Sequence, residues 1–291
     1  MGMAGGGKYG GGQSPLMDVA RRFSKNRTAM IGLGIVVLLV FTAIFAGVIA
    51  PEGIDDQDLS RTFQPPGRAN IMGTDNFGRD IFSRIVYGAR TSLQVGFTAV
   101  AVSLFSGLVM GSIAGFFGGK TDNILMRAID ILMSIPSVML AIAIISVLGT
   151  GLTNLMISVG LAAIPGYTRI TRAAVLSIRE WEFVEAARAI GASDVRIITR
   201  HILPNCMAPI IVQATIGLSI AILSAAGLSF IGLGVQPPTP EWGFMLSDGR
   251  RFLRDYPHMV MFPGLAIVIV VVAINMVGDG LRDALDPKLK K

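Results

Sequence analysis

The chain has 291 residues, of which 52% are hydrophobic and only 15% are charged, and its mean hydropathy is +0.63. A soluble domain carries about 25% charged residues, so this composition argues against a soluble enzyme and indicates a membrane protein. The net charge of +6 is attributed to basic residues that anchor membrane helices, so nucleic acid is not expected as a partner. A single cysteine and two distant histidines predict neither a disulfide nor a metal site.

Six apolar stretches are long enough to cross a bilayer as helices, because ~30 Å of hydrocarbon takes about 20 residues at ~1.5 Å each. The predicted spans are Met30–Ile49, Leu93–Phe117, Ile131–Leu148, Leu152–Thr168, Cys206–Gly234 and Met259–Gly278. The fourth is the weakest, since Pro165 and Gly166 interrupt it. The first is too long for the apolar region of a signal peptide, so we expect it to be retained. The predicted fold class is an all-α integral membrane protein.

The distribution of basic residues predicts that both termini are cytoplasmic. With the N-terminus inside, 17 of the 25 Lys and Arg fall in inside segments. Five of the other eight lie in the first outside loop, where six acidic residues accompany them. The predicted organisation begins with a cytoplasmic tail (1–28), which is disordered over 1–14 and then forms a short basic helix. A first transmembrane helix (29–50) and an extracytoplasmic loop (51–91) follow. The rest is a five-helix core (92–281), which includes a cytoplasmic segment (177–204), and a cytoplasmic tail (282–291).

Two outside segments carry distinctive residues. Gly73–Leu93 reads GTDNFGRDIFSRIVYGARTSL, and its apolar residues recur at roughly helical spacing. This pattern predicts either an amphipathic helix at the outer surface or a helical lead-in to the second span. Gln236–Gly243 reads QPPTPEWG, where three prolines and a tryptophan predict a stiff, non-helical loop.

Two motifs that mimic catalytic sites fail on their spacing. Gly118-Gly119-Lys120-Thr121 resembles the end of a phosphate-binding loop, but Ala114 stands where the first glycine is required, and a membrane helix precedes it. Ser229 lacks the glycine two residues later that a nucleophile elbow needs. We therefore expect no catalytic residues, and we interpret the first motif as a charged turn between spans.

The segment between the fourth and fifth spans has the composition of two short helices. Ser177–Ile190 favours a helix, and Gly191 is a natural stop where the chain can take a positive φ. Ser193 can cap the next helix, in which Val195, Ile198 and Ile202 form an apolar stripe. We expect the two helices to protrude from the membrane with Ala186 and Ala187 exposed near the tip.

This arrangement resembles the EAA loop of ABC importer permeases, whose pattern is EAA, three residues, Gly, nine residues and then I-x-L-P. The matching residues are Glu185, Ala186, Ala187, Gly191, Leu203 and Pro204. One position departs, because His201 stands where the family often has Ile. Three further stretches, at Gly73–Leu93, Phe230–Gly243 and Gly278–Pro287, resemble the dipeptide, oligopeptide and nickel (DppC/OppC) branch of these permeases.

The resemblance implies the type I importer permease fold, with six transmembrane helices in a bacterial plasma membrane. The chain would be a transport subunit rather than an enzyme and would bind no cofactor itself, since ATP and Mg belong to partner ATPase subunits. The implied partners are a second permease (DppB/OppB-like), two ABC ATPase subunits, an extracytoplasmic solute-binding protein and membrane lipid. The matching EAA-loop residues would couple the permease to the ATPase.

Other site residues follow from the position of the segments. We expect Asp75, Arg79, Asp80 and Trp242 to contact the solute-binding protein. Gln213 and Asn275 are polar residues within spans, which either line the solute path or form hydrogen bonds between helices. Peptide is the predicted cargo, with nickel or another small solute as the alternative. A membrane enzyme is disfavoured by the missing catalytic sets, and a lone channel or carrier by the EAA spacing.

Overall fold

The computed structural model describes residues 15–285, and nothing is described for 1–14 or 286–291, so the predicted disordered tail lies outside the described residues. Within 15–285, regular structure is helical apart from one isolated antiparallel bridge between Thr74 and Asp80. The helices are α1 (Pro15–Lys25), α2 (Arg27–Ile44), α3 (Ala46–Ile49), η1 (Leu59–Arg61), α4 (Ile81–Phe117), α5 (Gly119–Met133), α6 (Ser137–Leu148), α7 (Leu152–Ile178), α8 (Glu182–Ala189), α9 (Asp194–Arg196), η2 (Ile197–Ile202), α10 (Leu203–Phe230), α11 (Trp242–Gly249), η3 (Arg250–Phe252) and α12 (His258–Leu285).

Among the described residues, four helical stretches are long and apolar enough to cross a membrane: Arg27–Ile44, Ile81–Phe117, Asp194–Phe230 and His258–Leu285. They contain most of the first, second, fifth and sixth predicted spans. The pair α5 and α6 makes a fifth crossing if it is one broken span. The predicted third span at Ile131–Leu148 is divided between α5 and α6, and these two helices are bent by 88° on either side of Pro136. Proline lacks the N–H that would continue the helix.

The fourth predicted span lies within α7, which has 27 residues and continues through Pro165 to Ile178. Its second half carries Arg169 and Arg172, and α7 is not among the four apolar stretches. Arg172 forms a two-pronged ion pair with Asp122 of α5, with nitrogen-to-oxygen distances of 2.5 and 2.6 Å. A total of six spans therefore stays a prediction.

Helix α4 packs against α7 along a row of small residues. Gly107, Gly111 and Gly115 are buried and face α7. A Cβ at Gly111 would lie 2.6 Å from the carbonyl oxygen of Thr168, and one at Gly115 would lie 2.9 Å from Cβ of Val175. These glycines let the two backbones approach closely.

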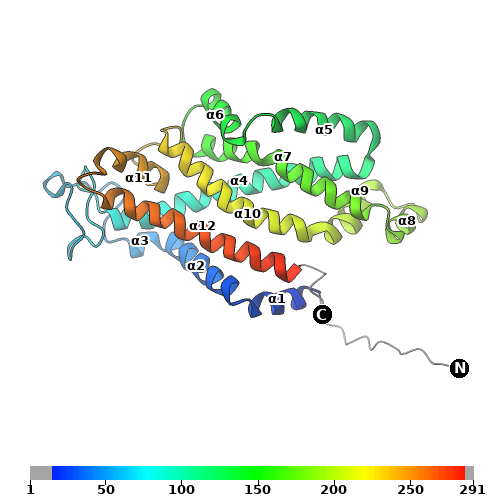
Figure 1. Ribbon diagram of the computed structural model, residues 1–291, viewed down its shortest axis with the longest axis horizontal. Coiled ribbons are helices and arrows are strands. Elements are labelled where there is room, and N and C mark those ends of the chain that lie inside the picture. The colour runs from blue at the N-terminus through cyan, green and yellow to red at the C-terminus, as the bar shows by residue number, and fades with distance from the viewer. Residues whose placement is uncertain (1–14, 286–291) are drawn as a thin grey trace.

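The bundle has two distinct ends (Figure 1). One end, here called the tip end, holds α8, α9 and α1, together with the last turn of α12. The opposite end, the loop end, holds residues 51–80 and α11. Helix α4 begins at Ile81 within the loop end and continues unbroken to Phe117, so the second half of the first loop is a lead-in to the span.

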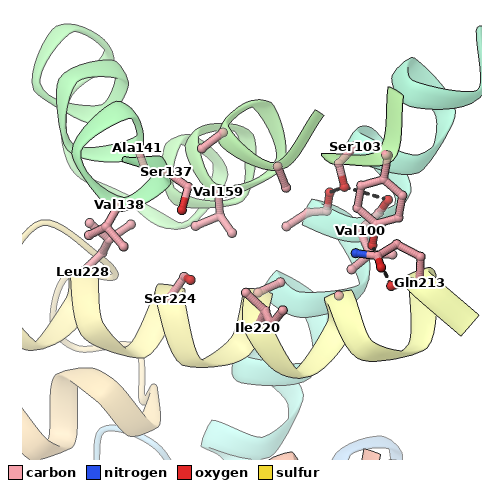
Figure 2. A pocket seen from close by; sticks show the side chains of 16 residues that line it. Val100, Ser103, Ser137, Val138, Ala141, Val159, Gln213, Ile220, Ser224 and Leu228 are labelled. Atoms are coloured by element: carbon pink, nitrogen blue, oxygen red, sulfur yellow. Dashed lines mark hydrogen bonds between the residues drawn. The ribbon is translucent and has the colours of Figure 1, made fainter. Parts of the chain in front are cut away.

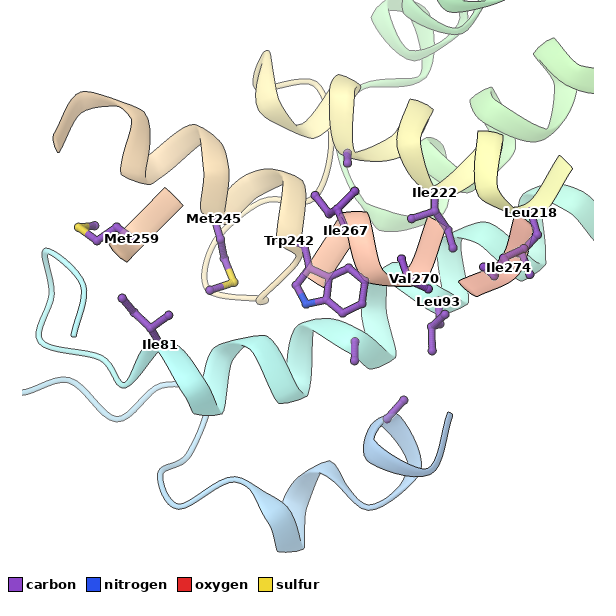
Figure 3. Packing of buried hydrophobic residues seen from close by; sticks show 13 residues of the cluster. Ile81, Leu93, Leu218, Ile222, Trp242, Met245, Met259, Ile267, Val270 and Ile274 are labelled. Carbon is purple, nitrogen blue, oxygen red and sulfur yellow. The ribbon is translucent and has the colours of Figure 1, made fainter. Parts of the chain in front are cut away.

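A hydrophobic cluster near the loop end joins α4, α10, α11 and α12 (Figure 3). Trp242 of α11 lies at its centre and is 1% exposed, with Ile222 of α10 and Val270 of α12 among its other buried members. Gly88 of α4 accommodates this ring, because a Cβ there would lie 3.0 Å from the indole. The predicted non-helical loop at Gln236–Gly243 is correct only up to Glu241, since Trp242 begins α11.

Candidate functional site

At the tip end, α8 and the following turn protrude from the bundle (Figure 1). Helix α8 ends in a Schellman motif: the Ala192 N–H donates to the Ala187 carbonyl over 3.1 Å, and the Gly191 N–H donates to the Arg188 carbonyl over 2.9 Å. Gly191 has φ of +79°, and a Cβ there would meet nothing within 4 Å. The glycine is therefore required for its backbone conformation and not for space, as the sequence predicts.

The first short helix is shorter than its predicted range. Helix α7 continues to Ile178, and α8 covers only Glu182–Ala189. Of the two alanines expected to be exposed, Ala186 is exposed but Ala187 is 4% exposed, so the prediction for Ala187 is wrong. Ala187 and Val184 contact a small core that α7 and α10 share, since both belong to the same buried cluster as Ile178. Glu185 remains exposed on the outer side of α8.

The second short helix merges with the fifth span through a π-helical turn, η2. A π turn adds one residue, so positions five apart fall on one face. Ile197 and Ile202 are both fully buried, whereas Val195 is 72% exposed, so the predicted stripe is wrong at Val195. Leu203 is half-buried against the same core, and Pro204 is exposed at the start of α10. Ser193 precedes the helix, but its side chain makes no capping hydrogen bond.

Apolar side chains that the sequence reasoning missed are exposed around this turn. Ile190 is 85% exposed, Val195 is 72% exposed and Trp181 is 54% exposed. The same segment also carries Glu182 and Glu185, which are exposed. Exposed apolar residues gathered on a protruding turn are a candidate protein-binding surface. The available signal was their position beside the EAA pattern, outside every apolar span.

At the loop end, a buried ion network involves two of the four residues expected to contact a binding protein. Asp75 and Arg79 form an ion pair with a nitrogen-to-oxygen distance of 2.6 Å, and their side chains are 8% and 5% exposed. Asp75 also accepts the backbone N–H groups of Phe77 and Arg79. Arg79 reaches Asp248 of α11 at 3.5 Å, and Arg84 of α4 lies 3.7 Å from Asp75. The network thus connects the first loop to α4 and α11.

The other two residues also make contacts within the chain. Asp80 caps α4 by accepting the Ser83 N–H over 2.7 Å and is held by the Asn70 amide over 2.9 Å. Trp242 is 1% exposed and donates its indole N–H to the Ile85 carbonyl over 3.0 Å. A direct contact of any of the four with another protein stays a prediction, and their described contacts are intramolecular.

Between the two ends, a cavity of about 100 Å³ lies among α4, α6, α7 and α10 (Figure 2). Gln213, one of the two predicted path residues, lines it, and the backbone carbonyl of Gln213 accepts a hydrogen bond from the Tyr167 hydroxyl over 3.5 Å. Asn275 of α12 lies elsewhere, where its side-chain oxygen accepts the Ser219 hydroxyl over 2.7 Å. This bond between α10 and α12 is the interhelical alternative for Asn275. Gly118 and Gly119, from the phosphate-loop mimic, form the tight turn between α4 and α5.

Within residues 15–285, no group of three or more His, Cys, Asp and Glu side chains is arranged to hold a metal ion. The described site is therefore made of helix surfaces, a buried ion network and a membrane-depth cavity.

The sequence matches two family models. Residues 107–291 match the binding-protein-dependent transport system inner membrane component, and residues 14–66 match the N-terminal TM domain of oligopeptide transport permease C. The chain is 49% identical to the dipeptide transport system permease protein DppC of Alkalihalophilus pseudofirmus, over 95% of this chain and 91% of that protein. It is 46% identical to the di/tripeptide transport system permease protein DppC of Pseudomonas aeruginosa, over 95% and 93%.

Further relatives and solved structures agree with these matches. The glutathione transport system permease protein GsiD of Escherichia coli is 44% identical over 96% of this chain and 92% of its own length. An inward-facing structure of the MetNI methionine ABC transporter matches with a TM-score of 0.58 at 21% identity, covering 70% of this chain and 96% of that one, and supports the fold alone. The chain therefore belongs to the binding-protein-dependent transport system inner membrane components, the permease subunits of ABC importers.

Proposed function

We propose that this chain forms half of the translocation pathway of a bacterial inner-membrane importer of short peptides. Its tip end would couple it to the conformational change of the ATPase subunits. The proposal rests mainly on the match to peptide permeases along nearly the whole chain, at 49% and 46% identity. The named cargoes of the three relatives cited above are a dipeptide, di- and tripeptides, and glutathione, and all of these are short peptides. Nickel is the alternative cargo within the same branch.

The coupling role is supported by the construction of the tip. Helix α8 is fixed to the bundle by Val184 and Ala187, which are buried against α7 and α10. Its other side presents Glu185, Ala186 and Ile190 to solvent. An element anchored to the bundle in this way transmits a rigid-body displacement to the helices that hold it. The continuous helix from Asp194 to Phe230 would carry that displacement into the membrane.

The partners follow from the family of this chain. It would need two ABC ATPase subunits, a second permease to complete the pathway, and an extracytoplasmic solute-binding protein at the loop end. Because Asp75, Arg79, Asp80 and Trp242 are buried, we propose that they hold the receptor surface in shape, and that exposed neighbours such as Ile71, Phe77 and Arg68 make the contact. The tip end would then be cytoplasmic.

The test is ATP-dependent uptake by the complete complex in proteoliposomes with its binding protein. We expect a labelled dipeptide to accumulate and to stimulate ATP hydrolysis severalfold, whereas nickel in its place gives no stimulation. A complex without its ATPase subunits is the control and should show no uptake. Nickel-dependent stimulation without a peptide response would overturn the cargo assignment, and uptake by the permeases alone would overturn the mechanism.

A further inference from the structure

The cavity between α6 and α10 is lined by small residues and has polar groups at its edge (Figure 2). Its walls include Ala99, Ala162, Ala163, Gly217 and Ala221. It lies within the charge-free stretches of α4 and α10, so it is at membrane depth. The small residues leave the space empty, because none of them carries a side chain long enough to fill it.

Two hydroxyl groups lie at the open edge of the cavity. Ser137 of α6, which is exposed, and Ser224 of α10, which is half-buried, face each other across it with their hydroxyl groups turned into it (Figure 2). Among the side chains drawn there, hydrogen bonds come from Ser103 and Tyr167, and none comes from Ser137 or Ser224. A hydroxyl group in hydrocarbon without a hydrogen bond is costly. The cavity is therefore suited to water or to a solute that can hydrogen-bond.

The break between α5 and α6 supports the same conclusion independently. Ser134, Ile135 and Pro136 are exposed, and Ser137 follows directly. Non-helical backbone at membrane depth is tolerated only where it is covered by protein or lines a water-filled space. Val138 and Ile220, at the mouth of the cavity, are 50% and 57% exposed. The mouth of the cavity is therefore open at the surface of this chain, and the proposed second permease would have to cover it.

The volume limits what can enter. An engineered apolar cavity of about 150 Å³ holds benzene. At about 100 Å³ this cavity accommodates one aliphatic side chain but neither an indole nor a whole dipeptide. The apolar walls suit a hydrocarbon group, and the polar edge suits the amide groups on either side of it.

We propose that this cavity receives one aliphatic side chain of the peptide in transit, with Ser137 and Ser224 available to its backbone amide groups. The assignment rests on the proposed function. It adds a side-chain preference that this subunit imposes after the binding protein has released its peptide. Ala163 and Ile220 are the residues through which that preference can be changed, since one lines the half-buried wall and the other the mouth.

The experiment compares uptake of Ala-Leu and Ala-Ala by the complete complex in proteoliposomes, with the binding protein saturated by each peptide so that its affinity does not enter. Ala163→Leu fills the cavity and should slow Ala-Leu about tenfold more than Ala-Ala, which corresponds to about 1.4 kcal/mol. Ile220→Ala removes three carbon atoms from the lining, which enlarges the cavity toward the size of an indole, and should speed Ala-Trp relative to Ala-Ala. Ala143→Leu, an exposed position of α6 outside the cavity, is the matched control and should leave both ratios unchanged.

The outcomes separate the two levels of the proposal. If the wild-type complex imports no peptide, the proposed function is wrong. If it imports peptides but both variants keep the wild-type ratios within about twofold, the side-chain pocket is wrong and the function stands. An Ala163→Leu variant that does not assemble leaves the decision to Ile220→Ala, for which an unchanged Ala-Trp ratio overturns the pocket.

Discussion

The two ends of this permease place polar and apolar side chains in opposite ways. At the loop end, Asp75 and Arg79 are nearly inaccessible and bond to the chain itself. At the tip end, Ile190 and Trp181 are largely exposed, while the charged Glu185 lies beside them in solvent. The charges of the loop end thus bond within the fold, whereas the apolar residues of the tip are exposed and form the surface that we propose for the ATPase partner. Residue type alone does not tell which segment binds another protein.

The largest effect should follow from breaking the ion network of the loop end. Asp75→Ala leaves Arg79 and Arg84 buried without their nearest carboxylate. Removing one partner of a buried ion pair costs about 3–5 kcal/mol. We expect a lower unfolding temperature of the purified complex and faster proteolysis of residues 51–80. Arg61→Ala, which breaks half-exposed ion pairs in the same loop, should change little. Wild-type protease resistance in Asp75→Ala would show that the network does not hold the loop.

The next effect separates the two alanines of the EAA pattern. Ala187→Leu inserts three carbon atoms into the packed contact of α8 with α7 and α10, and overpacking of this kind costs about 1–3 kcal/mol. Ala186→Leu is the matched control, because Ala186 is exposed. Hydrogen exchange of residues 182–190 in the purified permease should accelerate in the first variant only. Equal protection in both would mean that α8 is not anchored through Ala187.

Gly191 should show a smaller change in stability with a large change in coupling. A β-branched residue at φ +79° costs about 1–2 kcal/mol in backbone strain, although space is available for it. We expect Gly191→Val to insert normally but to lose peptide uptake per ATP hydrolysed. Gly34→Val is the control, since Gly34 lies in a helix with open space around it. Wild-type uptake in Gly191→Val would count against the tip as the coupling element.

Much of this fold could be predicted because apolar, charge-free stretches report helices directly. The helices α2, α4, α10 and α12 and the turn at Gly191 follow from local signals of this kind. The bend between α5 and α6 has a local signal in Pro136, but its angle of 88° is not given by any local pattern. The extension of α7 depends on Arg172 meeting Asp122 of another helix, and a contact between distant segments leaves no periodic signal.

The candidate site was predictable in position but not in the role of each side chain. The EAA spacing located the tip. The π turn, however, changes which residues are buried, so that Ile197 is buried where Val195 was expected to be. The loop-end residues were chosen because they are charged or aromatic, which is equally true of a buried ion network. Burial is decided by tertiary contacts, so exposure could not be read from residue type.

The smallest predicted effect concerns pH at the loop end. Glu241 is 2% exposed, caps α11 by accepting the N–H groups of Gly243 and Phe244, and burial raises its pKa above the ordinary value of 4.5. The folded state therefore holds this proton more tightly than the unfolded state, and the stability so gained is present below pH 4.5 and lost as pH rises through the raised pKa. We expect the unfolding temperature of the wild type, measured relative to that of Glu241→Gln, to fall as pH increases from 4.5 to 8. A wild type that gains on the variant over this range would mean that the two N–H groups outweigh burial, so that the carboxylate is the form that the fold prefers.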